Sequence, residues 1–355
     1  MNKKIDLVVP DECLSMIDCW EAIVTILFVN FNKDRDSICV SSDFYYDNLE
    51  PINRELTLEE IFRKTMFLYN KEVIEESLWF YEYFYSIKLE IVNKESIVEM
   101  KTVIQEELHD NNPVIIFVDT YHCNFNKMYQ KYHYFHAFII SGIDGNKLIV
   151  TDPTQHMENL EVDIDDVHLC TENLLKIRKL NDDKIWDPEY LIKYNFVKSN
   201  FRSTNTQTAR IKNIEAFFKD IMKSKSEIFR SFERSEESLS ILFTWLLKNI
   251  ALNIKKSSIF IEKAYSQEAL HLLSMLKDSH NSWMLAGRIF MKMYYANERI
   301  RGELFDKFCD LANDIITLEK VIIKEFISLL NLGDIRLEED LYGNYLSAAF
   351  EGSRT

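Results

Sequence analysis

The sequence predicts an α+β domain followed by an all-α domain, and three observations support this order. Apolar residues recur at helical spacing in several segments before residue 112. Short β-branched runs that flank a turn signal come next. Beyond residue 210, five segments repeat apolar residues every three or four positions, and no proline follows Pro188, which is typical of a helical bundle.

The composition supports two folded domains and excludes several classes of protein. With 355 residues, 47% of them apolar, the chain can bury cores of ordinary size. Its seven glycines form no phosphate-binding motif, so nothing favours a nucleotide-dependent mechanism. The six cysteines are irregularly spaced, which argues against a disulfide scaffold and favours a reducing compartment.

Neither a membrane span nor a secretory signal is predicted. The longest nearly apolar stretch, Ala22–Phe31, is far shorter than the roughly 20 residues that a membrane helix needs. The charged segment Met1–Asp6 is not followed by an apolar signal core. We therefore expect a cytoplasmic protein.

The net charge of −15 argues against nucleic-acid binding, and its distribution differs between the two halves. Residues 1–200 carry 20 Lys or Arg against 36 Asp or Glu, a balance of −16. Residues 201–355 carry 22 against 21, a balance of +1. An acidic half favours a cationic substrate such as an amine, although ordinary solubilising charge is the simpler interpretation.

Helices dominate the beginning of the chain. The expected helices cover Cys19–Phe31, Leu56–Tyr69, Lys71–Tyr85 and Ser96–Asn111. The aromatic run Leu78–Tyr85 is expected to pack in a core, and part of it is a candidate lining for an acyl tunnel.

Strands follow from residue 114. The expected strands are Val114–Asp119, Phe135–Gly142, Lys147–Thr151 and Leu160–Ile164. The segment Ile143-Asp144-Gly145-Asn146 is a hairpin signal between the second and the third. Helices before an antiparallel sheet are the α+β pattern.

The second half is expected to be a helical bundle. Lys198–Arg210 is rich in Ser, Thr and Asn and is interpreted as a linker, which divides the chain into domains 1–200 and 201–355. The expected helices are Ile211–Glu233, Glu236–Lys255, Ile259–Ser279, Trp283–Arg299 and Gly302–Asn331.

Cys19 has the setting of a reactive thiol. Asp18 and Glu21 form a capping-box pattern, which places Cys19 at the first position of its helix. The helix dipole and unpaired backbone N–H groups there favour a thiolate, while the two nearby carboxylates oppose it, so a cationic partner is needed. The other cysteines lack this setting and are expected to be structural: Cys13, Cys39, Cys123, Cys170 and Cys309.

His136 is the candidate partner, although a lone histidine in an apolar strand is more often a core residue. Asp152 on the next strand changes this interpretation if the two side chains share a face. A two-residue loop, Asp144-Gly145, places Asp152 on the opposite face. A three-residue loop that adds Asn146 places it diagonal to His136 on the same face.

Cysteine at a helix start, followed by histidine and an acid on paired strands, is an arrangement for nucleophilic catalysis. The histidine takes the proton of the thiol, and the acid orients the imidazole and stabilises its positive charge. Cys19, His136 and Asp152 are therefore the candidate catalytic residues.

The same residues carry a resemblance to papain-like cysteine enzymes. Asp18-Cys19-Trp20 looks like their nucleophile motif, and the order Cys, His in an apolar run, Gly and Asp152-Pro153 resembles bacteriocin-processing cysteine peptidases. With the segment Pro113–Tyr121 before the histidine strand, residues 10–200 resemble still more the N-terminal domain of the butirosin biosynthesis acyltransferase group. The nearest likeness is to the amide synthetases of the closthioamide type.

This resemblance implies a papain-like fold and an enzyme that makes amides from carrier-protein thioesters in nonribosomal natural-product biosynthesis. By position, Cys19 is the nucleophile, His136 the base and Asp152 the orienting acid. The implied partners are an acyl or peptidyl carrier protein, whose phosphopantetheine arm carries the acyl donor, and a small amine or diamine acceptor. No bound cofactor, nucleic acid or membrane is implied.

One departure from the papain-like pattern affects the expected reaction. Those hydrolases usually place a glutamine about six residues before the cysteine as an oxyanion-hole donor, and Cys13 stands there in this chain. Loss of this donor disfavours attack on a peptide bond more than attack on a thioester, which is more activated.

A zinc site and two other functions are the alternatives to this interpretation. The histidines His122, His133 and His136 with Cys123 do not have the spacing of a structural zinc site, so no metal is predicted. A cytoplasmic cysteine peptidase or amidase with the same triad is the alternative to the acyltransferase. A non-catalytic binding module is disfavoured because all three triad positions are filled.

Overall fold

The structure is a computed structural model in which the chain forms two compact units. It describes residues 3–11, 13, 19–33, 46, 53–65, 78, 80–93, 96–131, 133, 135–180, 187–201, 210–234 and 237–331. Residues 1–38 and 75–185 form the first unit, and residues 39–74 and 186–355 form the second. This division differs from the expected single boundary at residue 200, because residues 39–74 and 186–200 belong to the same unit as the C-terminal helices.

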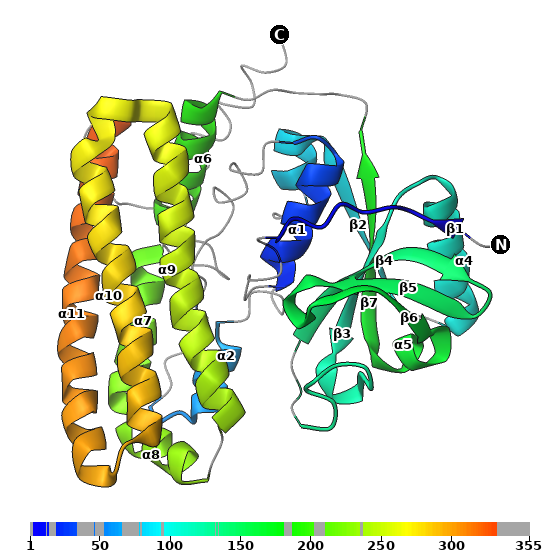
Figure 1. Ribbon diagram of the computed structural model, residues 1–355. Helices are drawn as coiled ribbons and strands as arrows, with labels where there is room; N and C mark the ends of the chain where they lie inside the picture. Colours follow the sequence, from blue (N-terminus) through cyan, green and yellow to red (C-terminus); the bar gives the residue numbers. More distant parts are fainter. Residues whose placement is uncertain are drawn as a thin grey trace. The chain divides into compact units, whose positions relative to one another are not determined.

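An antiparallel sheet is the scaffold of the first unit (Figure 1). Its hydrogen-bonded order is β2-β7-β3-β4-β5-β6, and β1 pairs with β4. The strands are β1 (Lys3–Lys4), β2 (Ile87–Asn93), β3 (Val114–Asp119), β4 (Phe135–Asp144), β5 (Lys147–Asp152), β6 (Met157–Asp163) and β7 (Thr171–Lys179).

Two helices pack on opposite faces of this sheet. Side chains alternate along β3, so Phe117 and Ile116 point to opposite faces. Phe117 contacts Trp20 at the start of α1 (Cys19–Asn30), with ring centroids 5.9 Å apart. Ile116 belongs to the buried cluster that includes Ile104 of α4 (Ile97–His109). The same cluster contains residues of the short helix α5 (Ile164–Cys170).

The predicted fold class, α+β with an antiparallel sheet followed by a helical region, is confirmed. The helices from Cys19 and Ser96 and the first three strands lie where the sequence predicts them. The predicted strand Leu160–Ile164 begins earlier and ends one residue sooner, as β6. Two strands that the sequence analysis missed, β2 and β7, pair with each other across about 80 residues of chain.

The described residues of the second unit form helices joined by short connections, and none of them forms a strand. Figure 1 shows α9, α10 and α11 as long neighbouring helices. The helices are α2 (Leu58–Arg63), α6 (Pro188–Phe201), α7 (Arg210–Lys223), α8 (Lys225–Glu233), α9 (Glu237–Tyr265), α10 (Leu270–Tyr295) and α11 (Glu298–Leu329). None of the helices in the described part of the chain is long and apolar enough to cross a membrane.

Several predicted helix boundaries are wrong in this unit. The predicted helix Ile211–Glu233 is interrupted at Ser224, and the predicted gap after Lys255 lies inside α9. The actual turn after α9 is the 3-10 helix Ser266–Ala269. The predicted linker overlaps the end of α6, and residues 202–209 lie outside the described part of the chain.

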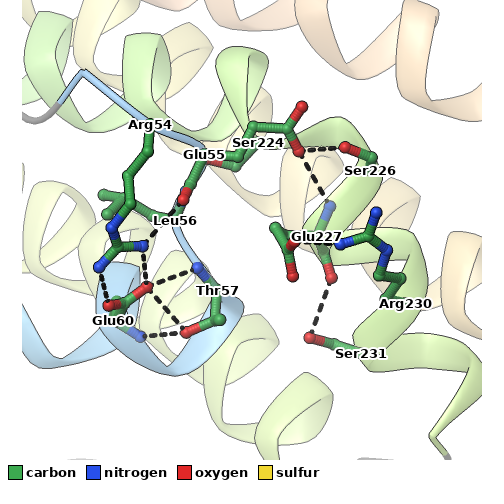
Figure 2. Close-up of polar contacts among 10 residues, drawn as sticks. All are labelled: Arg54, Glu55, Leu56, Thr57, Glu60, Ser224, Ser226, Glu227, Arg230 and Ser231. Carbon is green, nitrogen blue, oxygen red and sulfur yellow. Dashed lines mark hydrogen bonds and ion pairs between the residues drawn. The ribbon is translucent and has the colours of Figure 1, made fainter.

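Segment 53–65 belongs to the helical unit because polar contacts attach it to α8. Figure 2 shows Glu55 beside the first turn of α8, where its carboxylate accepts hydrogen bonds from the Ser226 hydroxyl and from the Glu227 backbone N–H. The Leu56 N–H donates to the Ser224 hydroxyl at 2.8 Å. A carboxylate at a helix N-terminus is stabilised by the helix dipole.

A buried carboxylate joins three helices of this unit. Glu319 of α11 accepts hydrogen bonds from the Ser279 hydroxyl at 2.6 Å and from the Trp283 indole N–H at 3.2 Å, both in α10. It also pairs with Arg210 of α7 at 3.1 Å. With 1% of Glu319 exposed, these partners replace the water that the charge loses on burial.

We expect Glu319→Ala to lower the free energy of unfolding by about 3 kcal/mol, because it removes the buried charge that pairs with Arg210 and the acceptor of two buried hydrogen bonds. Urea denaturation followed by circular dichroism measures this loss. The matched control is Lys320→Ala, the next residue of α11, which removes an exposed ion pair with Glu215 of α7. Equal effects of the two variants would contradict a structural role for the buried cluster.

Candidate active site

The packing of α1 holds Cys19 at the start of this helix. Residues from Ala22 to Phe28 are buried, and Trp20 packs against Phe117 and against Tyr81 at 6.1 Å between ring centroids. Cys19 is the first residue of α1 and is partly exposed. Glu21 lies in the first turn as predicted, and the proposed N-cap Asp18 lies outside the described residues.

The aromatic run before β2 packs on α1. Tyr81 and Tyr85 are buried and contact Phe28, with the Tyr85 ring centroid at 4.6 Å. Phe80 and Phe84 are buried beside them, and Trp79 lies outside the described residues. The expectation of core packing therefore holds for these four side chains.

His136 and Asp152 form a buried hydrogen-bonded pair. The Nε2 of His136 donates to Oδ2 of Asp152 at 2.6 Å. Only 4% and 3% of the two side chains are exposed. His136 is the second residue of β4 and Asp152 is the last residue of β5, so the pair lies at one end of the hairpin.

Two further contacts position the carboxylate of Asp152. Its Oδ1 accepts hydrogen bonds from the Thr154 hydroxyl at 2.9 Å and from the Gln155 backbone N–H at 3.3 Å. Asp152 thereby caps the 3-10 helix Pro153–Gln155, which contacts α1. Thr154 is not among the predicted site residues, although Asp followed by Pro and Thr is a recognisable capping signal.

The turn of the hairpin between β4 and β5 differs from both turns considered from the sequence, although Asp152 lies on the same face as His136. Neither of the two loops considered from the sequence forms: Asp144 pairs with Lys147, and Gly145-Asn146 is a two-residue turn. Gly145 has φ of +60°, as the first residue of a type II′ turn requires. A continuous ladder from this turn would place Asp152 opposite Ile139 and away from His136.

A β-bulge at Ser141 places the side chain of Asp152 on the same sheet face as that of His136. The pairing shifts by one residue between Ile140 and Gly142, so that Ile140 pairs with Val150 and Ile139 with Thr151. Extending this register places Asp152 opposite Phe138, diagonal to His136. A bulged strand leaves one residue unpaired, and here that residue is Ser141.

Neighbouring strands fit closely around the bulge. The hydroxyl of Ser141, a fully buried residue, donates to the Ile149 carbonyl at 3.4 Å. A Cβ on Gly142 would lie 2.9 Å from the Lys3 carbonyl oxygen of β1, so β1 can pair here only beside glycine. These contacts oppose slippage of the hairpin.

The electrostatics of the site favour a charged imidazole. Burial opposes protonation, but the charges of Asp152 and Cys19, and side-chain hydrogen bonds to both, hold the pKa of His136 well above its usual 6.5. Because Asp152 takes Nε2, the nitrogen left to face Cys19 is Nδ1. The structure thus brings together the three residues that the sequence selected.

Each of the remaining described cysteines is buried or has a thiol whose pKa is raised. The Cys13 thiol donates to the Ala22 carbonyl of α1 at 3.7 Å. A hydrogen bond with Cys170, together with burial, raises the pKa of Cys123. Burial raises the pKa of Cys309, and Cys39 lies outside the described residues.

The histidines considered for zinc separate into different environments. His136 pairs with Asp152, and Cys123 is buried in the sheet core. His122 and His133 instead approach Asp119, a grouping that the sequence analysis did not consider. Asp119 ends β3, and the two histidines flank the following loop, so only the fold brings them together.

A comparison with solved structures gives a distant structural likeness, whereas comparisons with protein sequences give no match. No protein-family model matches the chain, and no curated protein matches it. The chain is similar to a solved structure described as a C39-like peptidase from Bacillus anthracis, with a TM-score of 0.32 and 12% sequence identity. The match covers 51% of this chain and 99% of that chain.

We expect Asp152→Asn to lower the pKa of His136, because it removes the nearest negative charge and leaves the burial. Titration of the ring resonances by NMR measures this change. Asp144→Asn, at the far end of β4, is the control and should leave the titration unaltered. An unaltered titration in Asp152→Asn would contradict the assigned pairing.

The raised pKa of His136 makes the stability of the folded state depend on pH. A histidine with a higher pKa in the folded state stabilises that state fully below its unfolded pKa. This contribution is lost as the pH rises through the raised folded value. The Asp152→Asn variant should lose most of this pH dependence.

Proposed function

We propose that the chain is a papain-like cysteine-dependent acyltransferase that forms amides from carrier-bound acyl thioesters and an amine in thiotemplated biosynthesis. The observation that carries the proposal is the buried His136–Asp152 pair, whose second ring nitrogen faces the thiol of Cys19. The order of the motifs, which resembles that of amide synthetases, supports this choice of reaction.

The first step transfers the acyl group to the enzyme. A charged His136 beside Cys19 favours the thiolate, which attacks the carbonyl carbon of the thioester. The bond between that carbon and the phosphopantetheine sulfur breaks. His136 gives its proton to the leaving thiolate, so the products are an acyl–Cys19 thioester, a free carrier thiol and a neutral imidazole.

The second step transfers the acyl group to the amine. The amine attacks the acyl–Cys19 carbonyl, and neutral His136 takes the proton that the nitrogen loses. Departure of the Cys19 thiolate restores the charged pair. Asp152 keeps Nε2 of His136 occupied throughout, so proton transfer is directed to the nitrogen that faces Cys19.

The contact of Cys13 favours a thioester over a peptide bond as donor. Its thiol donates to the Ala22 carbonyl inside the packing of α1, so this position supplies no glutamine-like donor to an oxyanion. Backbone N–H groups at the start of α1 remain as donors, since first-turn N–H groups lack partners within a helix. A thioester needs less such stabilisation than an amide.

The acyl–Cys19 intermediate is directly testable. On incubation with an acyl-loaded carrier protein, we expect an acyl mass adduct on Cys19, which a small diamine discharges as an amide. Cys19→Ala should form no adduct. Asp152→Asn should fold but acylate at least about 100-fold more slowly, because the imidazole loses its orientation. Intact-mass spectrometry with peptide mapping measures each outcome.

The competing functions give different results in this experiment. Release of free acid whatever amine is supplied would establish the peptidase or amidase alternative in place of amide synthesis. Absence of any adduct with carrier-bound and small-molecule thioesters alike would favour a non-catalytic binding module. Amide formation that persists in Cys19→Ala would contradict the assigned nucleophile.

An exposed face of α10 is the proposed docking surface for the carrier protein. Lys277, Arg288 and Lys292 are exposed there at helical spacing, together with Leu285 and Tyr295, which are 45% and 67% exposed. Cationic side chains around apolar contacts complement the acidic surface typical of carrier proteins.

We expect reversal of the three charges, Lys277→Glu, Arg288→Glu and Lys292→Glu, to raise the KM for acyl-carrier protein at least about tenfold at low salt. The kcat with a small-molecule thioester should not change. The control is Lys307→Glu with Lys324→Glu, which reverses exposed charges on α11. An unaltered KM in the triple variant would remove α10 from the docking surface.

A further inference from the structure

We infer that Asp119, His122 and His133 form a binding site for a divalent first-row transition-metal ion at the base of the β3–β4 loop. The three residues each offer one ligand atom, and these atoms lie within 4.8 Å of one another. Two imidazoles and a carboxylate are ligands that Zn²⁺ and similar ions prefer. This site does not depend on the proposed acyltransferase activity.

The distances suit an ion after small side-chain movements. Oδ2 of Asp119 lies 2.7 Å from Nδ1 of His133 and 3.9 Å from Nε2 of His122. Ligand atoms around a tetrahedral ion with bonds of ~2.1 Å lie about 3.4 Å apart. The histidine side chains are 56% and 59% exposed, so neither is prevented from adjusting and water can complete the coordination.

Tyr121 orients two of the three ligands, Asp119 and His133. Its backbone N–H donates to Oδ1 of Asp119 at 3.0 Å, which leaves Oδ2 directed at both imidazoles. Its ring stacks on His133, with centroids 4.2 Å apart and planes at 19°. Support of this kind, outside the ligands themselves, orients metal sites and raises their affinity.

The chain position of the ligands gives the ion a structural role. Asp119 and His122 follow β3, and His133 precedes β4, so an ion would join the two ends of the connecting loop. Joining the ends of a loop removes conformational freedom from it. Asp119 pairs with Phe135, and the adjacent pair is Val118 with His136, so the ion would hold the strand ends that carry His136.

A metal titration in a Cys19→Ala background tests this site, because Cys19 and His136 would otherwise compete for the ion. We expect one Zn²⁺ per chain, measured by competition with a chromophoric chelator, and visible ligand-field bands with Co²⁺. Asp119→Asn, His122→Gln and His133→Gln should each weaken Zn²⁺ binding at least about tenfold. Zn²⁺ should also slow amide hydrogen exchange in residues 120–133.

His109→Gln is the matched control, because His109 also lies beside an aspartate, with 3.3 Å between Nδ1 and Asp110 Oδ1, but belongs to no three-ligand group among the described residues. It should leave the affinity unchanged. Tyr121→Phe keeps the stacked ring and should bind as the parent does, whereas Tyr121→Ala should bind more weakly. Equal affinity of the parent and all three ligand variants would show only adventitious binding and would overturn the proposal.

Discussion

The buried hydrogen bond between His136 and Asp152 is the constraint on which the catalytic unit depends. An unpaired carboxylate at this depth costs several kcal/mol, so the fold must deliver both groups to one place. The bulge at Ser141 sets the face of Asp152, and the Pro153–Gln155 turn satisfies its second oxygen. Packing of Trp20 then holds the start of α1, where Cys19 lies.

The local part of this arrangement is predictable from sequence. Apolar spacing locates α1, α4 and the strands β3 to β5, and the chemistry of cysteine, histidine and aspartate identifies the three site residues. The hairpin geometry is harder, because residues 144–147 allow several turns and β-bulges have no strong sequence signal. The three-residue loop considered from the sequence places Asp152 on the same sheet face as His136, although that loop does not form. The face is the same because a three-residue loop and a β-bulge each add one unpaired residue to the hairpin.

Interactions between distant segments account for most of what sequence reasoning missed. Strand β2 alternates apolar and polar residues at its start, but its partner β7 lies some 80 residues away. Glu55 contacts α8 across more than 170 residues, so segment 53–65 joins the helical unit without any local indication. The grouping of Asp119 with two loop histidines likewise arises only when β3 and β4 pair.

The bulge divides the hairpin into parts with unequal tolerance of insertions and deletions. Residues added at the tip, where no heavy atom lies within 4 Å of a Gly145 Cβ, leave the ladder near the site unshifted. Deletion of Ser141 would remove the bulge and leave the pairs Ile140–Val150 and Ile139–Thr151 in place, so Asp152 would stay diagonal to His136. Deletion of Thr151 would instead place Asp152 opposite Ile139 and turn it from His136, as damaging as replacing the aspartate itself. Homologous chains that preserve the chemistry should therefore vary in length at the tip or at the bulge, and not between Val150 and Asp152.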